Sequence, residues 1–239
     1  MKLGRISAPL PASTLFLSAY QTAPFQSPPE FSNFLPNATY STYGNTQIGD
    51  CTIAAAFNAI ETLKASPIPI YPDTLAIETY SSVTGYSPAN PATDRGAVVA
   101  DVLSAWSTSG FPLSALNQNF SASVDKLDAF CHILPKDIPL IKQAIVEFGG
   151  IYLGLLLPIS AQAPGPWTLN PSSPPWGGHA VWAAAYDAEG LTCITWGSPK
   201  KMTWDFFTAY TEEAWPLLSK DHVSSNFSLE KLRSDFNAL

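Results

Sequence analysis

The sequence predicts an α+β fold in which a helical lobe precedes a strand-rich lobe. The first half carries apolar residues at helical spacing over three segments, at 51–64, about 73–82 and about 97–109. The second half carries short apolar runs of the kind that form strands, at about 151–157, 179–186 and 191–196. With 46% hydrophobic and only 13% charged residues, a chain of 239 residues can bury a substantial core.

We expect one domain over residues 1–239, made of four parts. Residues 1–42 are rich in proline, which suits an extended N-terminal strap lying on the body. The helical lobe follows over 43–111, the β-rich lobe over 112–218, and a C-terminal tail with a helix over 219–239. The N-terminal strap and the C-terminal helix are also the parts through which an assembly partner could bind.

Three further helices are expected in the second half. Capping and terminating residues predict them at about 137–148, 203–218 and 229–237. In the middle one, a helical stripe typical of core packing runs through Trp204, Phe207, Tyr210 and Ala214.

The composition excludes several classes of protein. A net charge of −7 argues against a nucleic-acid binder, for which a basic patch is expected. No apolar run reaches the ~20 residues that span a bilayer. The first residues lack the sustained apolar stretch of a signal peptide. We therefore expect no nucleic-acid and no membrane partner, and a cytoplasmic or virion-associated protein.

The cysteines give no sign of a metal site. Cys131 and Cys193 lie in apolar surroundings without the spacing of a metal-binding pair, so both are expected to be structural thiols. An odd number of cysteines without a dense framework agrees with a reducing compartment. We expect neither a metal nor a cofactor.

Cys51 stands in a different setting. A polar segment with two glycines, 43–50, precedes it, and an apolar helix follows directly. The sulfur is thus expected at a helix N-terminus, where unpaired N–H groups and the helix dipole favour a thiolate. Asp50 opposes thiolate formation unless its carboxylate caps the first turn. A small buried hydrophobe is the alternative interpretation of this residue.

A partner base for Cys51 is available at His179. Two glycines precede His179 and an apolar run follows it, as at the start of a strand. A lone cysteine followed far downstream by such a histidine is a known arrangement for thiol–imidazole catalysis. His132 and His222 stand in polar connections and are expected in solvent.

With these residues in place, the chain resembles the papain-like cysteine peptidases, in a short bacterial or phage-type branch without a long propeptide. The resemblance covers roughly residues 35–215 and rests on four blocks in order. These are the segment 45–51 with its helix, the helix, glycine turn and strand of 138–156, His179-Ala180-Val181, and Thr195-Trp196-Gly197. The resemblance implies a helical lobe followed by an antiparallel β lobe, with the active-site cleft between them.

The oxyanion position departs from the family. The resemblance implies an amide donor six residues before the nucleophile, and that position is Asn45, which is shorter than the usual glutamine. Gln47, four residues before Cys51, is the competing donor. Register favours Asn45.

The third catalytic position also departs from the family. The residue that orients the histidine is implied two positions before the tryptophan, and here it is Ile194, which cannot bond an imidazole. Thr195 could take its place through a local bulge, although alternation along a strand turns it away from Trp196. Otherwise another residue substitutes, or the site is a dyad or inactive.

Gly96 and Trp196 are the expected substrate-binding residues. The resemblance places Gly96 in the loop that pairs with substrate backbone, where the lack of a side chain lets a peptide approach. Trp196 is implied to cover the histidine beside the cleft.

The sequence therefore predicts a cysteine peptidase that acts on a peptide or protein substrate through acyl transfer to Cys51, with His179 as base. Water would give hydrolysis and an amine would give transamidation. The alternatives are a catalytically impaired papain-like module of a phage or bacterial assembly, and a cell-wall endopeptidase or amidase with the same chemistry.

Overall fold

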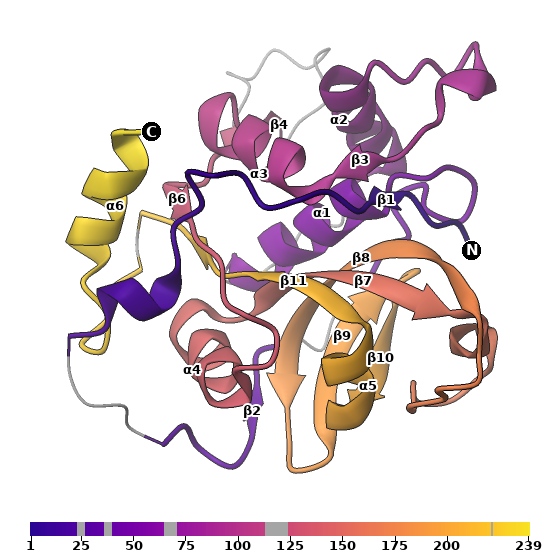
Figure 1. Cartoon of the computed structure of the whole chain (residues 1–239). Helices are drawn as coiled ribbons and strands as arrows, with labels where there is room; N and C mark the ends of the chain where they lie inside the picture. The colour runs from indigo at the N-terminus through magenta and orange to yellow at the C-terminus, as the bar shows by residue number, and fades with distance from the viewer. Residues whose placement is uncertain (23–26, 36–39, 65–70, 113–123, 221) are drawn as a thin grey trace.

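The computed structural model describes residues 1–22, 27–35, 40–64, 71–112, 124–220 and 222–239. A helical lobe lies above a sheet lobe in Figure 1, so the expected α+β architecture is confirmed. The helical lobe contains α1 (Cys51–Leu63), α2 (Asp73–Thr84), α3 (Val99–Thr108), β3 (Ala97–Val98) and the pair β4 (Phe111–Pro112) and β5 (Val124–Asp125).

The sheet lobe is built on an antiparallel sheet whose strands follow the order β10-β9-β8-β7-β11. These strands are β7 (Ile151–Pro158), β8 (Pro175–Tyr186), β9 (Gly190–Thr195), β10 (Ser198–Thr203) and β11 (Thr211–Trp215), and β2 (Ser32–Asn33) pairs with β8 off this path. The helices α4 (Ile138–Phe148) and α5 (Trp204–Tyr210) pack on it.

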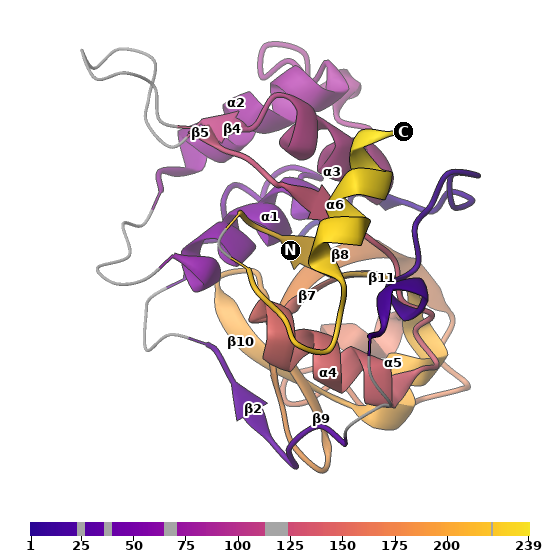
Figure 2. The same ribbon diagram turned by 90° about the vertical axis from the view of Figure 1, so that its left-hand side faces the viewer.

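Strand β8 is buried on both faces and joins the two lobes. Ala180, Trp182 and Ala184 belong to the core around α1, whereas Val181 and Ala183 belong to the core around α4 and α5. This division follows from the two-residue period of a strand. In Figure 2, α1 lies between the sheet and the helices α2 and α3, which explains why its side chains are buried on every side.

The predicted helix at about 203–218 is wrong beyond Tyr210. The Thr203 side chain caps α5 by accepting a hydrogen bond from the Phe206 N–H at 3.2 Å, as expected. The chain then leaves the helix and forms β11, which pairs with β7. The helical stripe ends because the edge of β7 offers backbone hydrogen bonds to another strand, so Ala214 is a strand residue.

The C-terminal helix docks on the body of its own chain. Helix α6 (Leu229–Asn237) matches the predicted range, and its Leu229 and Leu232 are buried in the core of the sheet lobe. It lies beside the pair β6 (Ala129–Phe130) and β12 (Leu217–Leu218), where the Arg233 guanidinium donates to Asp128. None of the helices in the described part of the chain is long and apolar enough to cross a membrane.

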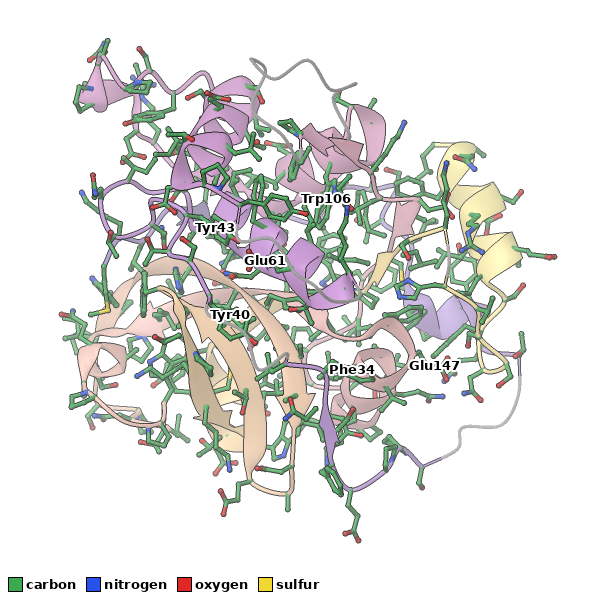
Figure 3. The ribbon with its side chains drawn as sticks, turned by 180° about the vertical axis from the view of Figure 1, so that it is seen from behind. Phe34, Tyr40, Tyr43, Glu61, Trp106 and Glu147 are labelled. Atoms are coloured by element: carbon green, nitrogen blue, oxygen red, sulfur yellow. The ribbon has the colours of Figure 1, made fainter. Side chains whose placement is uncertain are left out.

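A buried polar contact fixes the loop that leads into α1. Tyr43 has a left-handed backbone with φ of 53° and is fully buried. Its hydroxyl donates to the Glu61 carboxylate of α1, and the two side chains lie side by side in Figure 3. Because a bulky residue rarely adopts positive φ, this contact holds the loop in a conformation that it would otherwise leave.

The N-terminal segment runs between the two lobes. Strand β1 (Arg5–Ile6) pairs in parallel with β3 of the helical lobe, and Gly4 bonds to Gly178 of β8. In Figure 1 this indigo segment crosses the front of the molecule before it turns down to the short 3-10 helix η1 (Leu17–Tyr20). The first residues of the expected strap therefore lie in the groove between the lobes.

Candidate functional site

Cys51 is the first residue of α1, as expected, and its thiol is almost completely buried. Burial raises the pKa of the thiol to about 12. Backbone hydrogen bonds from Ala180, Gly4 and Arg5 act in the opposite direction, and the nearby Asp50 charge raises the pKa further. In this state the sulfur is a neutral thiol, although the helix N-terminus is suited to an anion.

Asp50 does not use its carboxylate to cap α1. It occupies the N-cap position, but its side chain makes no cap hydrogen bond. Burial raises the pKa of this carboxyl to about 8, against a lowering by the side chain of Asn45. A carboxyl with a raised pKa opposes a thiolate at Cys51 less than a solvent-exposed aspartate would.

Strand β8 brings Ala180, the neighbour of His179, into contact with the thiol. Ala180 provides a backbone hydrogen bond to the Cys51 sulfur, so the strand and the helix N-terminus are in direct contact at this point. Burial lowers the pKa of the His179 imidazole to about 3. Its Nδ1 is buried and has no hydrogen-bond partner among the described residues.

Thr195 contacts the other ring nitrogen. Its Oγ1 lies 2.7 Å from His179 Nε2, while Ile194 points into the core around α1 and is fully buried. Trp196 has φ of 46° and turns back, so that its ring stacks on the imidazole at 4.4 Å with an interplanar angle of 17°. The reversal after β9 lets Thr195 and Trp196 reach one ring, which strand alternation alone would prevent.

The two candidate oxyanion donors lie in different environments. Asn45 is buried, and its side-chain amide donates to the Ile48 carbonyl at 3.1 Å. Gln47 is exposed. Only Asn45 is therefore part of the packed loop that leads to Cys51, although its amide is engaged within that loop.

The predicted substrate-binding residues contact the chain's own N-terminal segment. The Gly4 carbonyl accepts from the Ala97 N–H at 2.8 Å, next to Gly96, and the Trp196 indole donates to the Lys2 carbonyl at 3.2 Å. We call residues 2–6 the groove segment. Gly96 has φ of 78°, a left-handed conformation that favours glycine at this position.

Glycines make room for the groove segment on both walls. A Cβ at Gly96 would lie 2.0 Å from the Gly4 carbonyl oxygen, and one at Gly178 would lie 2.1 Å from the Arg5 carbonyl oxygen. A Cβ on Gly4 itself would lie 1.7 Å from the Gly49 carbonyl oxygen. The groove between the lobes is thus shaped for an extended backbone directly over the thiol.

Arg5 anchors the groove segment, and sequence reasoning missed it. Its guanidinium donates to Glu213 at 2.6 Å and to Glu212, and the Arg5 side chain is only 1% exposed. The interpretation of 203–218 as one helix hid the strand that presents these carboxylates. The sequence contains one indication of this contact, which is the presence of a charged residue, Arg5, in the strap that was expected to lie on the body of the protein.

Two expectations outside the groove differ in outcome. Cys131 and Cys193 are free and buried, as expected for structural thiols. His132 is 1% exposed rather than solvated, because its ring packs edge-on against Trp215. This burial lowers the pKa of His132 to about 4. No group of three or more metal-binding side chains occurs within the described ranges.

Solved structures with the same fold are cysteine proteases. Xylellain, a cysteine protease from Xylella fastidiosa, matches with a TM-score of 0.69 and 15% identity, over 91% of this chain and 96% of that chain. A Carica candamarcensis cysteine protease in complex with E-64 matches with a TM-score of 0.58 and 11% identity, over 80% of this chain and 99% of that one.

A digestive procathepsin L 3 from Tenebrio molitor gives a TM-score of 0.59 and 13% identity, over 87% of this chain and 75% of that chain. No protein-family model and no curated protein sequence matches. The fold of this chain is therefore that of the papain-like cysteine proteases, as the resemblance implied.

Proposed function

We propose that this protein is a cysteine peptidase in which Cys51 is the nucleophile and His179 the general base. The observation that carries the proposal is the contact between the start of α1 and strand β8, and three features on these neighbouring elements of a protease fold support it. These are a thiol at a helix N-terminus, an imidazole with a free Nδ1 on the adjoining strand, and a hydroxyl on the imidazole Nε2.

The reaction begins with acylation of the thiol. When Thr195 Oγ1 accepts the Nε2 proton of His179, Nδ1 carries the lone pair and takes the proton of Cys51. The sulfur attacks the carbonyl carbon of the peptide bond and forms a C–S bond. The C–N bond then breaks, and the imidazolium gives its proton to the leaving amine.

Hydrolysis of the thioester completes the cycle. His179 accepts a proton from water, the hydroxide attacks the thioester carbon, and the C–S bond breaks. The carboxylic product leaves, and the proton returns to the sulfur. The Cys51 backbone N–H and the Asn45 amide are the proposed donors to the oxyanion, a contribution of order 10²–10³ in kcat for a well-placed group.

The groove segment keeps this site inactive in the proposal. With residues 2–6 in place, burial favours the neutral thiol and the neutral imidazole, as the raised pKa of Cys51 and the lowered pKa of His179 indicate. Departure of the segment would admit water and substrate. Hydration reduces both burial penalties and so allows the thiolate–imidazolium pair to form.

Thr195 favours an active site over the impaired binding module. That alternative depends on Ile194, which cannot orient the imidazole, but Thr195 supplies a hydrogen bond at 2.7 Å from the same strand. A hydroxyl is a weaker partner for an imidazolium than a charged or amide acceptor, so we expect a slower enzyme rather than an inert one.

Hydrolysis of a fluorogenic peptide library tests the proposal, with Gly4→Val used to displace the groove segment. In that background, His179→Ala is expected to lower kcat/KM about 10²- to 10⁴-fold, the usual contribution of a general base. Thr195→Val is expected to lower it about tenfold, and Thr195→Ser to restore most of the loss. The surface variant Glu189→Gln serves as the control.

Thermal unfolding separates loss of chemistry from loss of fold in each variant. The proposal fails if Cys51→Ala retains hydrolysis, or if the folded Gly4→Val chain cleaves no member of the library while its thiol is open to alkylation.

A further inference from the structure

We propose that Asp50 is a positioning residue for the oxyanion donor Asn45. In its neutral form the Asp50 carboxyl leaves one N–H of the Asn45 amide to the groove, and in its ionised form it withdraws that N–H. The proposal rests on the function proposed above, because it assigns a control of the proposed acylation to a residue that takes no part in the bond changes.

The Asp50 carboxyl is buried without a hydrogen bond. The residue is 0% exposed, and neither carboxyl oxygen has a hydrogen-bond partner among the described residues. Its backbone carbonyl, by contrast, accepts from the Ile53 N–H at 2.8 Å and from the Ala54 N–H at 3.0 Å. An ionised carboxyl in this place would be costly, so the arrangement suits a neutral acid.

The groups that act on Asp50 by charge are acids. Asp94, and Asp73 at the start of α2, raise its pKa through their negative charges. Tyr80 of α2 donates to Asp94 at 2.8 Å, and the Cys51 thiol of α1 is neutral. No ion pair within the described ranges includes Asp50. Burial and this repulsion therefore raise the pKa of Asp50 to about 8, against a lowering by Asn45.

A glycine turn packs the carboxyl beside the loop that carries the amide. Gly44 has φ of 92°, and its carbonyl accepts from the Ile48 N–H at 3.1 Å. A Cβ on Gly44 would lie 3.1 Å from Asp50 Oδ2 and 3.1 Å from Ile77 Cγ1. The carboxyl therefore packs against this turn, next to Asn45, rather than pointing into solvent.

The Asn45 amide has one N–H for which two acceptors compete. Asn45 is 1% exposed, and its amide donates to the Ile48 carbonyl at 3.1 Å. A side-chain amide has two N–H donors, so this bond leaves the second one. The Asn45 side chain also lowers the pKa of Asp50 as a hydrogen-bond donor, so the second N–H is within reach of that carboxyl. Asp50 and an oxyanion in the groove are thus its alternative partners.

Ionisation of Asp50 changes which partner wins. Loss of the proton leaves a buried anion, which is costly unless it gains a donor. A hydrogen bond to a carboxylate is about twice as strong as one between neutral groups, so the ionised carboxyl takes the second N–H of Asn45. The same charge raises the pKa of the Cys51 thiol. Both effects slow acylation as the pH rises through the pKa of Asp50.

Carbon-detected NMR of the unaltered, isotope-labelled chain tests the contact without catalysis. The Cγ signal of Asp50 reports its ionisation and the Cγ signal of Asn45 reports its amide; each is assigned through its absence in Asp50→Asn or Asn45→Ala. We expect both signals to shift with one midpoint near pH 8. The Asn45 shift should vanish in Asp50→Asn and persist in the exposed control Glu189→Gln. An Asn45 signal that does not follow Asp50 would overturn the inference.

The pH dependence of peptide hydrolysis tests the role of Asp50 in the reaction. In the Gly4→Val chain, kcat/KM is expected to fall about tenfold or more between about pH 7 and about pH 9.5, since losing a well-placed oxyanion donor costs about 10²–10³ in kcat. Adding Asp50→Asn should remove most of this fall, but much less of it when Asn45→Ala is also present. An alkaline fall of the same size in Asp50→Asn would contradict the proposed control.

The two experiments separate this inference from the peptidase proposal. If the Asn45 signal follows the ionisation of Asp50 but no peptide is cleaved, the coupling between the two residues stands and the peptidase proposal falls. If peptides are cleaved and the Asn45 signal is independent of Asp50, the peptidase proposal stands and the inference is overturned.

Discussion

Burial has opposite consequences in two neighbouring regions of the groove. At Cys51 and His179, which form no ion pair with any residue that the structure describes, burial raises the pKa of the thiol to about 12 and lowers the pKa of the imidazole to about 3, so both are neutral. Around Arg5, whose side chain is only 1% exposed, burial is offset by the carboxylates of Glu212 and Glu213 in hydrogen-bond contact with the guanidinium. The neutral thiol of Cys51 and the carboxylates of Glu212 and Glu213 thus both contact residues 2–6.

The ion pairs of Arg5 with Glu212 and Glu213, which we call the anchor, and the proposed catalytic groups are therefore linked through residues 2–6. The ion pairs hold the groove segment in place, and the segment excludes the water that the thiolate–imidazolium pair needs. Weakening the anchor should therefore activate the thiol, even though no anchor residue of the sheet takes part in the proposed chemistry.

The largest expected effect comes from Glu213→Leu. This variant leaves the Arg5 guanidinium partly unpaired in a buried site, and breaking a buried pair costs about 3–5 kcal/mol. We expect the rate of Cys51 alkylation by iodoacetamide at pH 7 to rise about 100-fold or more, read by peptide mass spectrometry. The variant Glu212→Gln, in which the replaced carboxylate is itself more exposed, should give about a tenfold rise.

If Cys51 in Glu213→Leu is alkylated more slowly than in the unaltered chain, at an unchanged unfolding temperature, the proposed dependence of thiol reactivity on the Arg5 ion pairs is wrong. Equal effects of the Glu213 and Glu212 variants would show that burial does not set the strength of the anchor.

A smaller effect is expected from acid. Burial raises the pKa of Glu212, but the hydrogen bonds from Arg5 and Ser7 and the Arg5 charge together lower it more, so the net pKa lies below the ordinary value of 4.5. A carboxyl with a lowered pKa in the folded state stabilises that state fully above its ordinary pKa, and this contribution is lost as the pH falls through the lowered value. The groove segment should therefore loosen below about pH 4.5.

Hydrogen exchange of the N-terminal peptide, corrected for the intrinsic pH dependence, measures this loosening. We expect protection of residues 2–6 to fall a few-fold between pH 5 and pH 3.5, and Glu212→Gln to remove most of the change. Protection that grows in acid would contradict the assigned sign.

The helices and the central strands could be predicted because their signals are local. The helix that starts at Cys51, the two glycines after 148 and the apolar run after His179 each define an element through its own residues. Strand β11 could not be predicted, because Trp204, Phe207 and Tyr210 continue a helical spacing that only the edge of β7 interrupts.

Placement of the groove segment depends on contacts between distant residues. Residues 2–6 have no periodicity, and nothing in them indicates that the Arg5 side chain ends between Glu212 and Glu213. The contact between Thr195 and His179 likewise depends on the left-handed turn at Trp196, which a sequence does not reveal for a residue other than glycine.

Cys51 alkylation in the unaltered chain and in Gly4→Val tests the central claim most directly, with the conservative segment variant Ile6→Val as control. A side chain at position 4 would overlap the Gly49 carbonyl, so the groove segment cannot stay seated. We predict slow labelling of the unaltered chain and of Ile6→Val, and fast labelling of Gly4→Val that His179→Ala reduces. Equally slow labelling of Gly4→Val, in a folded protein whose segment has lost exchange protection, would contradict the account.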